Sequence, residues 1–460
     1  MSFLQLVLKQ MRQRALATWL TLLSVLLGVA LAIAVMMVQR EGSKLLGQGD
    51  WGYDMVVGPK GSELQLVLAT TFHMGKAQST IPYAYYEVFP NNLPPEYAGE
   101  LRWKLPIAFG DNYQGHRIVG TTTAILGLDE SGRPLPPGAT FEYRRGRRLE
   151  LAEGREFHRA KFEAVIGSEV AARTGLKLNS TFKATHGTSA DERADEHDLQ
   201  WTVVGILKPT HTANDRVLFI PLVSFYTIPG HDLEAISRIA DRAATGPATR
   251  DAHEAHDDHD RTHEVRPDGT IELEIPKSRW RLSAILCASA GGIVGDQIAY
   301  AVNNGPEAMA VNPAREMAAF TQTYLAPGTK VLLVLAVLVT VVAAVGILVS
   351  IYNSTSARRR DIAILRALGA TRRRVLSLIC AEAGLLGFLG GTAGLILAHV
   401  GCGVASIFVR QWLGEGLAWL VVDAGELLYL LAVTALAALA GLVPALKAYR
   451  TPVATNLVLS

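Results

Sequence analysis

Long runs of apolar residues limit what this chain can fold into more than any other feature of its sequence. The first run, residues 18–38, contains no charged side chain. A helix over these 21 residues is about 31 Å long, enough to cross the hydrocarbon core of a membrane. Three more runs follow, at 331–351, 375–409 and 427–446. The sequence therefore predicts four transmembrane helices, of which the third is long enough to protrude or tilt.

The overall composition agrees with a chain that lies partly in lipid, since 49% of its residues are hydrophobic. Its 44 basic and 42 acidic side chains nearly cancel. Such a balance gives no reason to expect a nucleic-acid partner, which usually requires a basic face. The three cysteines, Cys287, Cys380 and Cys402, indicate no disulfide framework.

Positive charges near the runs give the orientation of the chain, because Lys and Arg are enriched on the cytoplasmic side of membrane proteins. Lys9, Arg12 and Arg14 precede the first run, and Lys447 and Arg450 follow the last. Both termini are therefore predicted to be cytoplasmic. The first run is longer than a usual signal-peptide core, so we interpret it as an uncleaved anchor.

The loops then alternate between the two sides of the membrane. Residues 1–17, 352–374 and 447–460 are predicted to be cytoplasmic. Residues 39–330 form one large outside domain between the first and second helices, and 410–426 form a short outside loop.

Residues 358–374, RRRDIAILRALGATRRR, place seven arginines between two apolar runs. A hydrophobic stripe at helical spacing lies inside this segment and predicts a short amphipathic helix that ends at Gly369. The stripe consists of Ile362, Ile364, Leu365 and Leu368. Two interpretations stay open. The helix lies on anionic lipid headgroups, or its stripe inserts into a groove on a cytoplasmic partner.

The outside domain mixes strand-like runs such as EAVIG and WTVVGIL with helical ones such as SEVAARTGL, which predicts an α+β fold. A helix is expected over Glu307–Leu325. We find no Ser/His/Asp or Cys/His arrangement, so no enzymatic activity is expected. The chain also has no GxxxxGK[ST] motif, so ATP and Mg²⁺ are expected only on a separate subunit.

The third run contains two overlapping GxxxG pairs, which remove side-chain bulk and let helices approach closely. The pairs are Gly387 with Gly391 and Gly390 with Gly394. We expect them to pack within the helix bundle or against a second copy of the chain. In the same run, Glu382 is expected to form an ion pair with the arginines at 372–374, and His399 to be a packed, hydrogen-bonded residue.

A histidine-rich tract lies within an insert at about 229–278. Its four histidines are His253, His256, His259 and His263. Their spacing could place imidazoles on one side of a helix and hold Zn²⁺ or Cu²⁺. The low hydrophobicity and high charge of the tract equally fit a solvated, disordered insert. Both interpretations stay open.

Four segments resemble a known family. RRRDIAILRALGATRRRVLSLICAEAGLLGFLGGTAGLIL and GLVPALKAYRTPVATNL resemble the FtsX-like permease domain of mechanotransmission-type ABC transporters. EGREFHRAKFEAVIGSEVAARTGLKLNSTF and WTVVGILKPTHTANDRVLFIPL resemble the MacB-like periplasmic core domain of the same family. The resemblance implies four transmembrane helices and an α+β core domain inserted between the first two.

The resemblance also implies that the segment at 352–374 is a coupling helix that docks on a separate ABC ATPase. The residues implied in this contact are Arg358, Arg359, Arg360, Asp361, Ile362, Leu365, Arg366, Leu368 and Gly369. Further implied partners are a second permease copy, membrane lipid and a periplasmic adaptor or substrate protein. The implied function is ATP-driven export or extraction of drugs, peptides or lipoproteins at a bacterial inner membrane. The alternatives are a signalling module that activates a periplasmic partner, and zinc-linked transport through the histidine tract.

Overall fold

The structure is a computed structural model. It describes residues 15–46, 50–76, 79–187, 196–228, 263–357, 362, 364, 366, 369–413 and 416–450. The chain divides into two compact units. The helical unit comprises Met1–Leu46, Thr321–Trp412 and Gly416–Ser460, and the sheet unit comprises Gly47–Phe320 with Leu413–Glu415.

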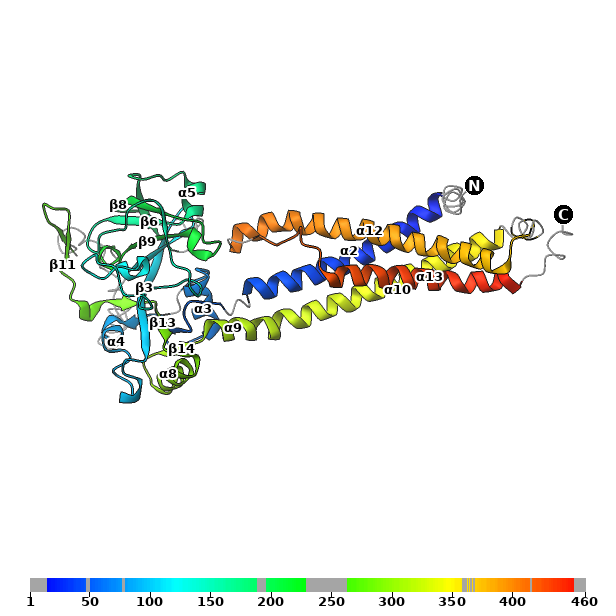
Figure 1. The fold of residues 1–460 in the computed structure, drawn as a ribbon. Helices are drawn as coiled ribbons and strands as arrows, with labels where there is room; N and C mark the ends of the chain where they lie inside the picture. The colour runs from blue at the N-terminus through cyan, green and yellow to red at the C-terminus, as the bar shows by residue number, and fades with distance from the viewer. Residues whose placement is uncertain are drawn as a thin grey trace, which may run out of the picture. The chain divides into compact units, whose positions relative to one another are not determined.

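The helical unit is built from long helices (Figure 1). They are α2 (Ala15–Leu46), α10 (Ala326–Ala357), α12 (Arg372–Leu413) and α13 (Ala424–Arg450). In the described part of the chain, four helical stretches are long and apolar enough to cross a membrane: Thr18–Gly42, Pro313–Ser356, Arg372–Arg410 and Ala424–Lys447. The prediction of four transmembrane helices is confirmed, and each helix extends beyond its apolar run.

Small and branched side chains form the core of this bundle. Those that are no more than 2% exposed include Val29, Ile33, Ala343, Ala383 and Ala437. Larger apolar side chains cover the outside, and Val342 and Leu428 are each 69% exposed. Helices that are apolar all round suit a lipid environment, where small residues at the contacts allow close packing.

The sheet unit contains a mixed ten-stranded sheet. Its strands are β1 (Met55–Gly58), β3 (Leu101–Tyr113), β4 (His116–Thr121), β5 (Leu151–Gly154), β6 (Glu163–Ile166), β7 (Thr181–His186), β8 (Glu196–Leu207), β9 (Val217–Pro221), β13 (Ala284–Ser289) and β14 (Met309–Val311). The order is β14-β1-β13-β3-β4-β9-β6-β8-β5, and β7 pairs with β3 and β8. The pairs β4/β9 and β6/β8 are parallel, and the other pairs are antiparallel.

Helices accompany this sheet, which confirms the predicted α+β domain. They are α3 (Glu63–Thr71), α4 (Tyr83–Val88), α5 (Ser168–Thr174), α6 (Leu222–Phe225), α8 (Gly292–Asn304) and α9 (Pro313–Phe320). Aromatic rings fill much of the core. Trp201 is fully buried, stacks on Phe182 and donates a hydrogen bond from Nε1 to Ser224 Oγ at 3.1 Å.

One expectation for this unit is corrected, and one point that the sequence left open is decided in part. The helix expected over Glu307–Leu325 begins only at Pro313, because Met309–Val311 instead pairs with β1 as strand β14. Asn312 separates the two elements and caps the helix, since its Oδ1 accepts a hydrogen bond from the Arg315 amide.

The end of the expected insert is also ordered. Strand β10 (His263–Val265) and strand β11 (Ile271–Leu273) form an antiparallel hairpin, and the Ile271 amide donates to Ala160 O at 2.7 Å. The rest of the insert, up to residue 262, lies outside the described residues.

Candidate functional site

The connector between α10 and α12 is the arginine-rich segment that carried the coupling-helix prediction. Ile362, Ile364 and Arg366 are helical, and Gly369 follows with a φ of 99°, a left-handed conformation that favours glycine. The Gly369 amide donates to Arg366 O at 3.1 Å, which closes the helical turn. The other candidate contacts lie outside the described residues, namely Arg358, Arg359, Arg360, Asp361, Leu365 and Leu368.

The two described isoleucines of the connector have different environments. Ile362, expected to contact a partner, is partly buried and packs against the core of the helix bundle. Ile364 is 43% exposed. Residues two apart on a helix point in different directions. Ile362 therefore attaches the connector to the bundle, while Ile364 points away from that contact and is exposed.

The four glycines of the two GxxxG pairs in α12 lie at contacts between helices. A Cβ atom added to Gly387 would lie 2.5 Å from Ala437 Cβ on α13, and one added to Gly394 would lie 2.6 Å from Leu26 O on α2. Gly391 likewise faces α13 at Leu430, and Gly390 faces α2 at Val25. The two GxxxG pairs thus serve two different neighbours within one copy of the chain.

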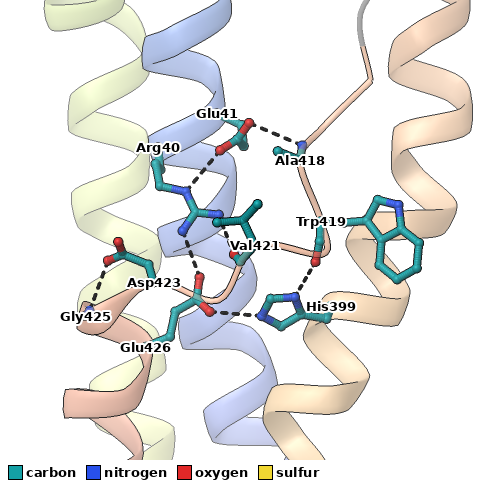
Figure 2. A network of polar contacts seen from close by, with 9 residues as sticks. All are labelled: Arg40, Glu41, His399, Ala418, Trp419, Val421, Asp423, Gly425 and Glu426. Atoms are coloured by element: carbon teal, nitrogen blue, oxygen red, sulfur yellow. Dashed lines mark hydrogen bonds and ion pairs between the residues drawn. The ribbon is translucent and has the colours of Figure 1, made fainter.

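A polar network connects α2, α12 and the loop before α13 (Figure 2). Arg40, near the end of α2, donates from Nη1 to Glu426 Oε1 at 3.2 Å, from Nε to Glu41 Oε1 at 3.0 Å and from Nη2 to Val421 O at 3.2 Å. Glu41 Oε2 in turn accepts from the Ala418 amide at 3.2 Å. One guanidinium thereby holds two carboxylates and a loop carbonyl.

His399 of α12 completes the network. Its Nε2 lies 2.9 Å from Glu426 Oε2, and its Nδ1 is hydrogen-bonded to Trp419 O (Figure 2). A carbonyl only accepts, so Nδ1 carries a proton. His399 is thus packed and hydrogen-bonded, as predicted.

Burial gives this network its strength. The side chain of Glu426 is 1% exposed and that of His399 is 10% exposed. An ionic contact is stronger where water is excluded, and removing one partner leaves a buried charge without compensation. The network therefore fixes the end of α2 to α12 and to residues 418–426. Only weak signals in the sequence point to it, because Arg40 and Glu41 lie just outside the first apolar run and Glu426 lies just outside the last.

Glu382, expected to pair with the arginines at 372–374, is buried. That ion pair stays a prediction.

The sheet unit contains a cavity of about 470 Å³. Its apolar walls are formed by Leu222, Val223, Leu273, Ile275 and Trp280. Charged side chains also line it, and Arg159 and Glu130 form an exposed ion pair at 3.2 Å. Burial, together with nearby carboxylates, raises the pKa of the lining Tyr83 to about 12, so its hydroxyl stays protonated. Such a volume suits a small amphiphilic molecule.

Of the histidine-rich tract, only His263 is described. It lies in β10, its ring contacts Phe162 edge-on, and burial lowers its pKa. His253, His256 and His259 lie outside the described residues, so metal binding by the tract stays a prediction.

Comparisons with known proteins agree with both units. Residues 18–255, more than half of the chain, match the model of the MacB-like periplasmic core domain. Residues 333–453 match the C-terminal domain of FtsX-like permeases.

A curated relative supports the same assignment. An uncharacterized ABC transporter permease of Methanocaldococcus jannaschii is 33% identical over 120 residues, which cover 26% of this chain and 29% of the relative. The match thus spans less than a third of either protein. Taken with the two domain matches, it shows that this chain belongs to the FtsX-like and MacB-like permease family of ABC transporters.

Proposed function

We propose that this chain is the membrane subunit through which a separate ABC ATPase moves a periplasmic domain, in order to export or extract amphiphilic substrates. The proposal rests on family membership and above all on the connector, where Ile362 packs against the bundle and Ile364 is exposed. When a partner bound at Ile364 moves, the connector moves with it. The contact of Ile362 with the bundle then transmits this movement to the transmembrane helices.

In this proposal the connector and both termini are cytoplasmic, the sheet unit is periplasmic, and the membrane is a bacterial inner membrane. The basic residues around the connector support this orientation. ATP and Mg²⁺ bind to the ATPase, and a second permease copy completes the complex. The four glycines of the GxxxG pairs pack against helices of the same copy, so the contact between copies uses other exposed apolar surfaces of the bundle.

Movement can reach the sheet unit through the chain itself. α10 is preceded by a π-helical turn at Thr321–Leu325, which follows α9 directly. The chain before α9 is β14, which pairs with β1. In this proposal the segment of chain that joins α10 to α9 and β14 carries movement to the sheet unit.

Replacing Ile364 by Asp should abolish the stimulation of ATP hydrolysis in the complex reconstituted with the co-purified ATPase. A buried carboxylate in an apolar groove costs several kcal/mol, enough to prevent docking. Ile364→Leu keeps the apolar contact and should retain the stimulation. Full stimulation in the correctly inserted Ile364→Asp complex would contradict the proposal.

The cavity of the sheet unit is the proposed place for the apolar part of the substrate. Ala160→Trp, which adds a large ring to the lining, should weaken saturable binding of the amphiphilic dye anilinonaphthalene sulfonate to the chain in nanodiscs by about ten-fold. Ala152 lies on exposed strand β5 outside the lining, so Ala152→Trp is the matched control. Equal dye affinity in the two variants would exclude the cavity as a binding site.

A further inference from the structure

Three side chains with metal-binding atoms converge in the sheet unit, far from the histidine-rich tract in sequence. They are Asp111 on β3, His186 at the end of β7 and His197 on β8. One ligand atom of each lies within 4.8 Å of the others. The sheet brings them together, because Asp111 and His186 are direct partners in the β3/β7 register and β7 also pairs with β8.

The two distances to Asp111 fit one tetrahedral metal ion. His186 Nδ1 lies 3.4 Å and His197 Nε2 lies 3.7 Å from the same oxygen, Asp111 Oδ1. Ligands about 2.0–2.1 Å from a tetrahedral Zn²⁺ are roughly 3.4 Å apart from one another. Both spacings are longer than a good hydrogen bond, and the exposed His186 ring has room to adjust toward a shared ion.

The backbone around the three residues is held in place. Asn112, next to Asp111, donates from Nδ2 to Gly187 O at 3.0 Å and to Thr185 O at 3.4 Å. The Gly187 amide donates to Gly110 O at 3.2 Å. The residues on both sides of His186 are therefore tied to those on both sides of Asp111, the kind of support that orients ligands in metal sites.

Burial also favours a cation at this position. The side chain of Asp111 is 0% exposed and that of His197 is 13% exposed, while that of His186 is 56% exposed and gives access from solvent. Among the residues that the structure describes, the buried His197 Nε2 has no hydrogen-bond partner. A metal ion would bind this nitrogen and neutralise the buried carboxylate at the same time.

We propose that Asp111, His186 and His197 bind one late first-row divalent cation, represented by Zn²⁺, with water as the fourth ligand. Two imidazoles and one carboxylate suit such an ion, whereas Ca²⁺ and Mg²⁺ prefer oxygen ligands throughout. The ion joins strands β3, β7 and β8 and stabilises this part of the sheet. The site does not depend on the proposed transport function.

The test uses the full chain, stripped of metal with a chelator and titrated with Co²⁺, whose visible absorption reports tetrahedral nitrogen and oxygen ligands. Unaltered protein should bind one Co²⁺ with this spectrum, and Zn²⁺ should displace it. Asp111→Asn and His197→Gln should each weaken binding ten-fold or more. His186→Asn alters an exposed side chain, so its equal loss would show that misfolding is not the cause.

The histidine-rich tract supplies the control. A variant with His253→Asn, His256→Asn and His259→Asn should keep the tetrahedral Co²⁺ spectrum and its affinity. The proposal is overturned if the spectrum is absent from the unaltered chain, if it survives in His186→Asn, or if only the tract variant loses it.

Discussion

Replacing Gly394 by valine is expected to separate α12 from α2 and to inactivate the protein. The new Cβ would lie 2.6 Å from Leu26 O, 2.9 Å from Val29 Cβ and 3.1 Å from Ala30 N. Two of these three atoms belong to the backbone of α2, so no side-chain rotation relieves the clash. Overpacking commonly costs about 1–3 kcal/mol, and contact with an immovable backbone places this variant at the upper end.

The loss of packing between α12 and α2 can be measured through Cys402, which is buried on α12. In Gly394→Val, Cys402 should react with a maleimide at a lower temperature, as read by mass spectrometry of the labelled peptide. Gly401 is the matched control, since no atom lies within 4 Å of a Cβ added there. Gly401→Val makes the same change in helix propensity without the clash and should behave like the unaltered chain. Identical labelling of the two variants would show that α12 does not pack closely on α2.

Replacing Glu426 by leucine is expected to have the second large effect. The substitution removes the carboxylate that contacts both Arg40 Nη1 and His399 Nε2, and the side chain that carries it is only 1% exposed. Breaking a buried ion pair from one side costs about 3–5 kcal/mol. Arg40 keeps Glu41 and Val421 O, so we expect the lower end of that range and detachment of residues 418–426.

The same labelling assay measures this effect, because Cys402 lies one turn from His399 on α12. Asp423, in the loop just before α13, is the control. It is exposed, and its side chain accepts a hydrogen bond from the Gly425 amide at 3.0 Å (Figure 2). Asp423→Asn should change the free energy of unfolding by less than about 1 kcal/mol. The temperature at which Cys402 is labelled should therefore stay close to that of the unaltered chain. If Cys402 is labelled at the same temperature in Glu426→Leu as in Asp423→Asn, the network does not hold residues 418–426 in place.

The sequence predicts the parts of this fold that depend on local composition. Long apolar runs were sufficient for the four transmembrane helices, because a membrane leaves few alternatives to a helix. The GxxxG spacing likewise indicated close packing in α12. It could not indicate that Gly387 and Gly391 face α13 while Gly390 and Gly394 face α2, since that depends on how three helices are arranged.

Contacts between distant residues could not be predicted in the same way. Met309–Val311 looked helical, yet its backbone pairs with β1, because tertiary pairing overrides a weak local preference. The dense histidine tract indicated a metal site by composition, whereas Asp111, His186 and His197 stand apart in the sequence and meet only through strand register. Arg40 and Glu426 meet for a similar reason.

The most direct test of the account is photo-crosslinking from position 364 in native membranes. A photoreactive residue that replaces Ile364 should form an adduct with a nucleotide-hydrolysing ABC subunit, and the same residue at the exposed Val265 of the sheet unit should not. Two results would contradict the proposed coupling. One is that position 364 forms adducts with lipid alone, and the other is that it reacts with an impermeant reagent added outside the cell.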